Sequence, residues 1–325
     1  LARGFSGVNT SFRRERGDRL DLKKGDFMAV VRIDNLPGSG PERERECCRA
    51  LEKGDVLLFP TTPFRISEED RAFLLERRQA EAGYHKNIAY RPESGRVTGV
   101  ARQHPEDARR LREVLGRYSR TVVEFTSELL PAYSHGWKID YASFRPQEEA
   151  GRRLSQHSRN DLLHVDAFPT RPTRGDRIFR VFTNVNPEAP RKWKTGETFE
   201  ELAERFAVSS GILDRAARPG LVRGMLRLAS SAGLPVRSRP PYDEFMHRFH
   251  NFLKDNGPYQ ESARAERIDF LPNASWMVFT DSVTHSVLEG QFALEQTFII
   301  GRETLVFPER APIAILERMA GRAMA

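Results

Sequence analysis

From about residue 161 onward, apolar residues recur at every second position in several short runs. This period is typical of β-strands, in which successive side chains point to opposite faces. The strongest strand candidates are rich in Phe, Val and Ile and span 162–168, 178–185, 275–280 and 292–300. The segments between them do not alternate regularly between strand and helix. The pattern therefore favours an α+β fold, with an antiparallel barrel or sandwich and helices packed outside it.

The first half of the chain contains one long helical pattern and some shorter elements. Apolar residues recur every three or four positions over about 105–130 until Pro131, so the sequence predicts one helix there. A strand is predicted over 55–59, ending at Pro60. Another helix is predicted to begin after Ser67, because this residue suits an N-cap and three acidic residues follow it.

We expect one folded domain over 27–325, with a helical and basic insert at about 197–255. Residues 1–26 are polar and basic, which predicts a disordered tail. Because Met28 opens the first strand-like run, the native start is expected there. The alternative is a genuine basic arm that contacts acidic lipid or nucleic acid. One helix of the insert would carry an apolar stripe made of Tyr242, Phe245, Met246, Phe249, Phe252 and Leu253.

The composition limits the compartment and the class of partner. Of the 325 residues, 39% are hydrophobic, and the longest apolar runs are strand-sized and far short of a membrane span. No apolar stretch near the N-terminus reads as a secretory signal. Cys47 and Cys48 are adjacent and poorly placed for a disulfide, so we expect reduced thiols in a cytoplasmic protein. The net charge of +7 favours an anionic partner such as nucleic acid, a membrane surface or a phosphorylated substrate.

A His-x-Asp pair lies within the first strand candidate, 162–168. Residues two apart in a strand point to the same face, so His164 and Asp166 would converge on one point. Burying Asp166 without a partner among its apolar neighbours would be costly, so a cation is expected beside it. Two histidines and one carboxylate form the facial triad of non-haem iron oxygenases and leave positions open for cosubstrate and oxygen.

His285 is the best candidate for the third ligand. It follows an apolar strand and a polar turn and precedes the strand 292–300. A His-x-Asp pair on an early strand and a His over a hundred residues later resemble the order in double-stranded β-helix oxygenases. We therefore expect a double-stranded β-helix (jelly-roll) core with packed and inserted helices. A His-x-Asp pair alone is a weak signal, because it occurs by chance in many chains. A solvated helix face explains His247 and His250 better than a metal site does.

A 2-oxoglutarate enzyme also needs a cation for the distal carboxylate of that cosubstrate. Arg180 fits, because period two places it among apolar residues and its planar guanidinium matches a carboxylate. The alternative is a structural salt bridge to Asp or Glu. The strand 292–300, where many enzymes of this superfamily carry the Arg, has none. Gln296, Thr297 and Asn184 are further candidates for hydrogen bonds to the cosubstrate.

Longer motifs around these residues resemble the Kdo hydroxylases. Together they extend from about residue 50 to the C-terminus, so only the tail falls outside the resemblance. The matching runs are His164-Val-Asp-Ala-Phe-Pro-Thr with the following Arg-Pro-Thr-Arg-Gly-Asp-Arg-Ile, Arg-Val-Phe-Thr-Asn-Val-Asn (180–186), Trp-Met-Val-Phe-Thr-Asp-Ser-Val-Thr-His (276–285), Gly-Gln-Phe-Ala-Leu-Glu-Gln-Thr-Phe (290–298) and Pro312-Ile-Ala-Ile-Leu-Glu-Arg.

The resemblance implies an iron(II)- and 2-oxoglutarate-dependent dioxygenase that uses O2. Its substrate would be Kdo (3-deoxy-D-manno-oct-2-ulosonic acid) on a lipid A precursor, hydroxylated at C3 at the cytoplasmic face of the inner membrane. The metal ligands would be His164, Asp166 and His285, the cosubstrate would pair with Arg180, and ascorbate is expected to stimulate turnover.

Because such a substrate carries carboxylates and phosphates, arginines near the site are candidates for binding it. Arg145 is one, and it would equally suit the cosubstrate. Basic residues of the insert would lie on an acidic bilayer, where each contributes about 1 kcal/mol. The other candidates for substrate contacts are Arg171, Arg174 and Arg177, and those for the bilayer are Arg215, Arg218, Arg223 and Arg227.

Two alternatives stay open at this stage. The first is the same oxygenase chemistry on a different substrate, such as a protein side chain or a small acid. The second is a non-enzymatic barrel that binds an anionic ligand, with the His-x-Asp pair serving only the structure. Nucleic acid is not expected as the partner, because the stacking aromatics of nucleic-acid modules are not laid out recognisably.

Overall fold

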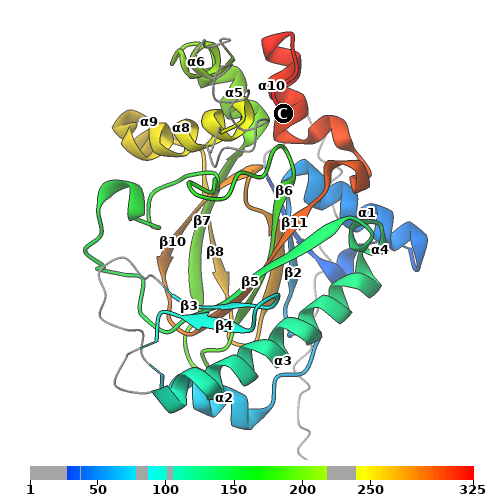
Figure 1. Ribbon diagram of the computed structural model, residues 1–325, viewed down its shortest axis with the longest axis vertical. Coiled ribbons are helices and arrows are strands. Elements are labelled where there is room, and N and C mark those ends of the chain that lie inside the picture. The colour runs from blue at the N-terminus through cyan, green and yellow to red at the C-terminus, as the bar shows by residue number, and fades with distance from the viewer. Residues whose placement is uncertain (1–27, 37, 78–86, 101–104, 218–238) are drawn as a thin grey trace, which may run out of the picture.

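The computed structural model describes residues 28–36, 38–77, 87–100, 105–217 and 239–325 (Figure 1). The predicted tail over 1–26 lies outside these residues. So do three of the four arginines predicted to lie on the bilayer, Arg218, Arg223 and Arg227.

A large β-sheet occupies the centre of the molecule (Figure 1). Within the described residues it has eight strands in the order β1-β2-β9-β6-β11-β5-β3-β4. The pair β1 and β2 is parallel, and the other neighbours are antiparallel. The strands are Val30–Arg32 (β1), Val56–Phe59 (β2), Ile88–Arg91 (β3), Arg96–Thr98 (β4), Trp137–Arg145 (β5), Arg177–Asn184 (β6), Ser275–Phe279 (β9) and Ala293–Ile300 (β11).

A smaller antiparallel sheet has the strand order β10-β7-β8. Its strands are Arg191–Thr198 (β7), Glu266–Phe270 (β8) and Val283–Glu289 (β10). None of the three is among the predicted strands. In β7, Trp193 is buried, but its neighbours Lys192 and Lys194 are polar and the buried positions on either side of it are Arg191 and Thr195. Polar residues at the buried positions hide the alternation from the sequence.

The helices pack around the sheets, and α5, α6, α8 and α10 gather at one end of them (Figure 1). No described helix combines the length and the apolar character that a membrane crossing requires. The helices are α1 (Pro41–Lys53), α2 (Glu68–Leu75), α3 (Pro105–Leu129), α4 (Pro131–Ser134), α5 (Phe199–Phe206), α6 (Ile212–Ala217), α8 (Pro241–Asp255), α9 (Gly257–Ser262) and α10 (Pro312–Ala320), with 3-10 turns at Ile33–Asn35, Gln156–Ser158, Arg302–Thr304 and Pro308–Arg310.

The elements predicted in the first half are confirmed. Strand β2 ends at Phe59, directly before Pro60. Ser67 caps α2, and its Oγ accepts a hydrogen bond from the backbone N–H of Asp70 at 3.1 Å. Helix α3 ends at Leu129, and the proline that follows opens the short helix α4.

Three of the four strands predicted in the second half are confirmed as β6, β9 and β11. The prediction for 162–168 is wrong, because that segment pairs with the rest of the protein only at isolated points. His164 forms a single antiparallel bridge with His285. The backbone N–H of Asp166 donates to the carbonyl oxygen of Thr280, in the turn between β9 and β10. The segment is extended but belongs to no ladder.

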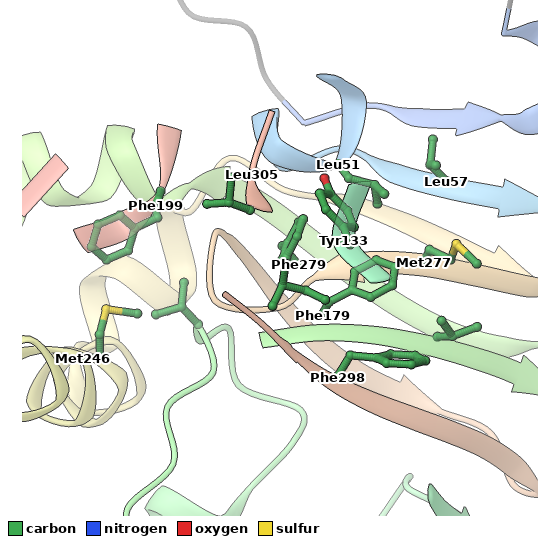
Figure 2. Packing of buried hydrophobic residues seen from close by; sticks show 14 of the residues in the cluster. Leu51, Leu57, Tyr133, Phe179, Phe199, Met246, Met277, Phe279, Phe298 and Leu305 are labelled. Carbon is green, nitrogen blue, oxygen red and sulfur yellow. The ribbon is translucent and has the colours of Figure 1, made fainter. Parts of the chain in front are cut away.

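Alternating residues of the large sheet face two different clusters. Phe179, Phe279 and Phe298 pack with Tyr133 of α4 and the helices on one face, as Figure 2 shows. The intervening residues, such as Phe182 and Trp276, pack against aromatic residues of the small sheet. The two sheets therefore share one core. The second cluster is completed by Met28, Val56, Trp193, Ile268, Phe270, Ala274, Val278, Val283 and Val287.

A buried ion pair joins the start of β6 to the turn after β9. The Nε–H of Arg177 donates to both carboxylate oxygens of Asp281 at 3.0 and 3.2 Å, and both side chains are almost fully buried. We expect Asp281→Ala to lower the free energy of unfolding by about 3–5 kcal/mol, because it leaves a buried cation unpaired. Urea denaturation measures this. In the control Glu200→Ala, which breaks an exposed pair with Arg318, the loss should stay below about 1 kcal/mol. Equal losses in the two variants would contradict the prediction.

Candidate metal centre

Two chain segments far apart in the sequence bring the metal-ligand candidates together. His164 and His285 exchange two backbone hydrogen bonds, of 3.2 and 3.0 Å, across their bridge. The backbone of Asp166 is held by Thr280 at 2.8 Å. These contacts place His164 and Asp166 beside strand β10, which carries His285.

The ligand atoms of these three side chains all lie within 4.8 Å of one another. The Nε2 atom of His164 is 3.7 Å from Oδ1 of Asp166, and the Nε2 atom of His285 is 3.9 Å from Oδ2 of the same carboxylate. The predicted triad is thus assembled around one point. Two imidazoles and one carboxylate match the facial triad of non-haem iron sites.

The hydrogen bonds of the two imidazoles involve Nδ1 and leave Nε2 of each ring free to bind a metal. The Nδ1 atom of His164 lies 2.7 Å from the carbonyl oxygen of Leu162, and Nδ1 of His285 lies 3.2 Å from that of Val283. A carbonyl oxygen only accepts hydrogen bonds, so each Nδ1 carries the proton. Each Nε2 then presents a lone pair to the centre of the triad, as in metal-ligating histidines.

The electrostatic environment favours the states that bind a metal. Burial lowers the pKa of both His164 and His285 below the usual value, which keeps the imidazoles neutral. Burial raises the pKa of Asp166, but the guanidinium of Arg180 and the two imidazoles outweigh it, so the pKa lies well below the usual range. The Oδ2 atom of Asp166 is buried and accepts no hydrogen bond among the described residues. A buried anion of this kind fits a cation.

A small cavity of about 40 Å³ adjoins the triad. Its lining combines apolar side chains with three arginines from three different strands. The residues are Arg145, Asn160, His164, Asp166, Arg180, Phe182, Arg191, Trp193, His285 and Val287.

Glu295 is the common partner of two of these arginines. Strand β11 lies between β5 and β6, so Arg145 and Arg180 reach Glu295 from opposite sides. Arg145 Nη2 donates to Glu295 Oε2 at 2.6 Å, and Arg180 Nη1 lies 3.0 Å from Oε1. Arg180 Nη2 also lies 3.3 Å from Oδ2 of Asp166. The salt bridge that the sequence left open for Arg180 is therefore present, and its second partner is the metal-ligand carboxylate itself.

Arg191 is the third arginine of the cavity and is almost fully buried. Its Nη1 donates to the carbonyl oxygen of Gly290 at 2.9 Å, and its Nη2 lies 3.5 Å from Oε1 of Glu149. Burial and the neighbouring Arg145 lower the pKa of Arg191 to about 10, so it stays charged at neutral pH. Neither Arg191 nor Glu295 has a recognisable signal in the sequence, because their roles arise only when the strands pair.

The other cosubstrate candidates lie outside the cavity lining. The side-chain amide of Asn184 donates to the carbonyl oxygens of Ala189 and Phe270, both at 3.0 Å. That of Gln296 donates to backbone carbonyls, including that of Thr297 at 2.8 Å. Thr297 points to the metal face, but its hydroxyl donates to Glu295 at 3.1 Å. The donor groups of these three side chains therefore already have partners within the protein.

The three arginines after the His-x-Asp segment occupy different settings. Arg177 is fully buried with Asp281 and has no surface to offer a substrate. Arg171 pairs with Asp140, and Arg174 is exposed on a turn. Only Arg171 and Arg174 stay candidates for substrate contacts.

His250 lies beside the metal centre, and the prediction of a solvated helix face is wrong for it. Its ring meets that of His164 edge-on, with centroids 4.9 Å apart, and its Nδ1 lies 2.8 Å from the carbonyl oxygen of Val165. On the other side of the triad, the ring of Trp193 stacks on His285 at 5.4 Å. These rings hold the two imidazoles in position, and the sequence carries no signal for either contact.

Comparison with known proteins places this arrangement in a family. Residues 37–323 match the family described as 3-deoxy-D-manno-oct-2-ulosonic acid (Kdo) hydroxylase. A comparison with curated proteins found no match.

Solved structures of the Kdo hydroxylase KdoO, a non-haem Fe(II) α-ketoglutarate-dependent dioxygenase, are 34% identical to this chain. Its complex with α-ketoglutarate (2-oxoglutarate) and Fe(III) aligns with a TM-score of 0.77, over 92% of this chain and 98% of that one. The cobalt(II) complex aligns with a TM-score of 0.77, over 91% of this chain and 96% of that one. The complex with succinate and Fe(III) aligns with a TM-score of 0.75 over the same shares of the two chains. The sequence match and the shared structure lead to one conclusion: the chain belongs to the Kdo hydroxylase family.

Proposed function

We propose that this protein is an iron(II)- and 2-oxoglutarate-dependent dioxygenase that hydroxylates Kdo at C3 on a Kdo–lipid A precursor. The observation that carries the proposal is the triad, in which two neutral imidazoles and one ionised carboxylate turn their free ligand atoms toward a common point. Membership of the Kdo hydroxylase family and the iron and α-ketoglutarate bound by KdoO support it.

His164, Asp166 and His285 would hold the iron. Bound there, iron supplies the oxygen activation that hydroxylation of an unactivated C–H bond needs, while 2-oxoglutarate is oxidised to succinate and carbon dioxide. The neighbouring rings of Trp193 and His250 keep the ligand geometry fixed. We propose O2 as the oxidant and ascorbate as a stimulant of turnover.

The charges around the cavity suit a divalent cation together with a dianion. Three guanidiniums, of Arg145, Arg180 and Arg191, are paired with three carboxylates of the described residues, those of Asp166, Glu149 and Glu295. Arg152 also pairs with Glu149, so this group of side chains carries one net positive charge. An Fe²⁺ ion adds two positive charges, which the two carboxylates of 2-oxoglutarate offset.

Arg180 is the residue that we assign to the distal carboxylate of 2-oxoglutarate. It lines the cavity beside Asp166, and its planar guanidinium suits a bidentate contact. Iron bound to the carboxylate of Asp166 would neutralise part of its charge. The ion pair between Asp166 and Arg180 would then be weaker. Arg145 is the second candidate, since it lines the same cavity and shares Glu295.

We propose further that the two sheets are the halves of a double-stranded β-helix within a single domain over 27–325. The aromatic cluster shared by both sheets supports this architecture, as does the bridge from His164 to His285 on strand β10 of the small sheet. The helices α5, α6 and α8 belong to the predicted insert at 197–255. The net charge of +7 suits a peripheral position at the acidic cytoplasmic face of the inner membrane.

The purified, iron-loaded protein is expected to add one oxygen atom to Kdo attached to a lipid A precursor. The assay uses Kdo–lipid A vesicles with iron(II), ascorbate and 2-oxoglutarate, and mass spectrometry of the Kdo fragment reads the result. The control omits 2-oxoglutarate and should give no mass increment. Succinate release without added oxygen on Kdo would show that the protein is an oxygenase that acts on a different substrate. Failure to turn over 2-oxoglutarate at all would contradict the enzymatic proposal.

A further inference from the structure

A second hollow, of about 340 Å³, lies on the outer part of the large sheet. It shares no lining residue with the metal cavity. We call it the outer hollow, and its lining residues are Arg91, Glu93, Lys138, Ile139, Asp140, Phe168, Arg171, Pro172, Thr173, Arg174, Asp176 and Ile299.

Phe168 contacts one residue of the outer hollow and one residue of the metal cavity. It lies two residues beyond the metal-ligand candidate Asp166, and it lines the outer hollow. The guanidinium carbon of Arg171 lies 4.3 Å from the centre of its ring, and that of Arg180 lies 5.9 Å from the same point. The two sites therefore lie close together, on either side of the sequence step from Asp166 to Phe168. A molecule with one part at the metal can extend its next part over Phe168.

Two guanidiniums of the outer hollow are held in place before any ligand arrives. Arg171 forms an ion pair with Asp140, and its guanidinium carbon lies 4.6 Å from the centre of the Tyr141 ring. Arg91 donates to the hydroxyl of Tyr141 at 2.6 Å and lies 5.0 Å from the same ring centre. Tyr141 thus fixes both arginines. Prearranged cations lose little conformational entropy on binding an anion.

Lys138 and Arg174 are two further cations, both exposed. Among the described residues, neither forms a hydrogen bond through its side-chain nitrogens or an ion pair, although Lys138 lies close enough to Asp176 to affect its pKa. The lining holds four cations against three carboxylates, and Arg171 already uses Asp140. The outer hollow therefore has cationic capacity left for a ligand.

The turn that presents Arg174 is strained and held in place. Arg174 has a φ of 58°, in the left-handed region that a non-glycine residue adopts only at a cost. The carboxylate of the buried Asp243 accepts hydrogen bonds from the backbone N–H groups of Thr173 and Arg174, at 2.6 and 3.1 Å. These bonds fix the turn in the conformation that points Arg174 into the lining.

We propose that the outer hollow binds an oxyanion-bearing sugar of the substrate, the unit next to the Kdo that lies at the metal. The inference rests on the proposed function and names the part of the substrate that is recognised. Guanidiniums and a lysine suit a carboxylate or a phosphate, and Phe168, Ile139 and Ile299 offer apolar surface to the sugar ring.

The test compares the double variant Lys138→Ala/Arg174→Ala with the wild type, both loaded with cobalt(II) and 2-oxoglutarate. Equilibrium binding to lipid A that carries two Kdo units is measured in mixed micelles, so that no turnover is needed. Loss of two cations is expected to weaken binding by about tenfold or more, while the affinities for cobalt(II) and for 2-oxoglutarate stay within about twofold. Arg267→Ala, on the exposed side of β8, is the matched control and should bind as the wild type does.

The outcomes separate the two proposals. Equal binding by the double variant and the wild type would contradict the proposed role of the outer hollow and would leave the proposed function unaffected. Absence of binding by the wild type itself would overturn both. The source of the oxyanion is distinguished with micelles of a substrate from which the lipid A phosphates have been removed. If the double variant no longer differs from wild type on that substrate, the hollow binds a phosphate, and if the difference persists, it binds a carboxylate.

Discussion

We expect His164→Ala, Asp166→Ala and His285→Ala each to abolish hydroxylation and iron retention while the protein still folds. Two remaining ligands hold iron poorly, and an unloaded centre cannot activate oxygen. A fall in activity of at least about 1,000-fold is therefore expected. Iron content after desalting and turnover of 2-oxoglutarate are the measurements.

Circular dichroism is the control for folding in these variants. The triad lies in a cavity whose walls come from both sheets, so loss of one side chain should leave the secondary structure intact. His247→Ala is the matched histidine control, because His247 lies half-buried on α8 outside the triad. Full activity in any one triad variant would exclude that residue as a ligand.

Arg180→Ala is expected to raise the concentration of 2-oxoglutarate required for half-maximal turnover by at least about 30-fold. A charge-assisted, bidentate contact to a desolvated carboxylate contributes roughly 2–5 kcal/mol. Arg180→Lys should recover part of the affinity for 2-oxoglutarate, because lysine restores the positive charge but cannot make the bidentate contact of a guanidinium. Iron retention should not fall, since Arg180 competes with the metal for Oδ2 of Asp166. The two readouts separate a cosubstrate role from a structural one.

Arg152→Ala serves as the control for Arg180→Ala. Arg152 is also largely buried and pairs with Glu149 at 3.2 Å, but it does not line the metal cavity. Its removal should leave the 2-oxoglutarate requirement within about twofold of the wild type. If Arg180→Ala behaves in the same way, the carboxylate contact lies elsewhere, and Arg145 is the next residue to replace.

Local patterns predicted much of the scaffold correctly. Helix α3 and the start of α2 at Ser67 depend on residues close together in the sequence, whose spacing and capping chemistry act locally. The same holds for β6, where alternation placed Arg180 and Phe182 on the face opposite to the helices. The triad could also be predicted from the sequence, since a His-x-Asp pair and one distant His are distinctive once the family motifs accompany them.

The misjudged segments share a physical cause, which is pairing between residues distant in sequence. The segment 162–168 has the alternation of a strand, but its backbone pairs only through one bridge to His285 and one hydrogen bond to Thr280. His250 was assigned to solvent because its helix presents it off the apolar stripe. The helix packs so that this position meets His164 instead.

The family, the helices, most of the alternating strands and the three residue types of the metal centre could be predicted from the residues alone. These depend on local spacing or on motifs that a linear chain displays. Which buried charges lie next to one another could not be predicted without the fold. Arg145, Arg180 and Glu295 come from three strands, and the strand order β6-β11-β5 alone makes them neighbours. A buried charge needs an oppositely charged partner in the folded core. The separation of two residues along the chain does not reveal which residue that partner is.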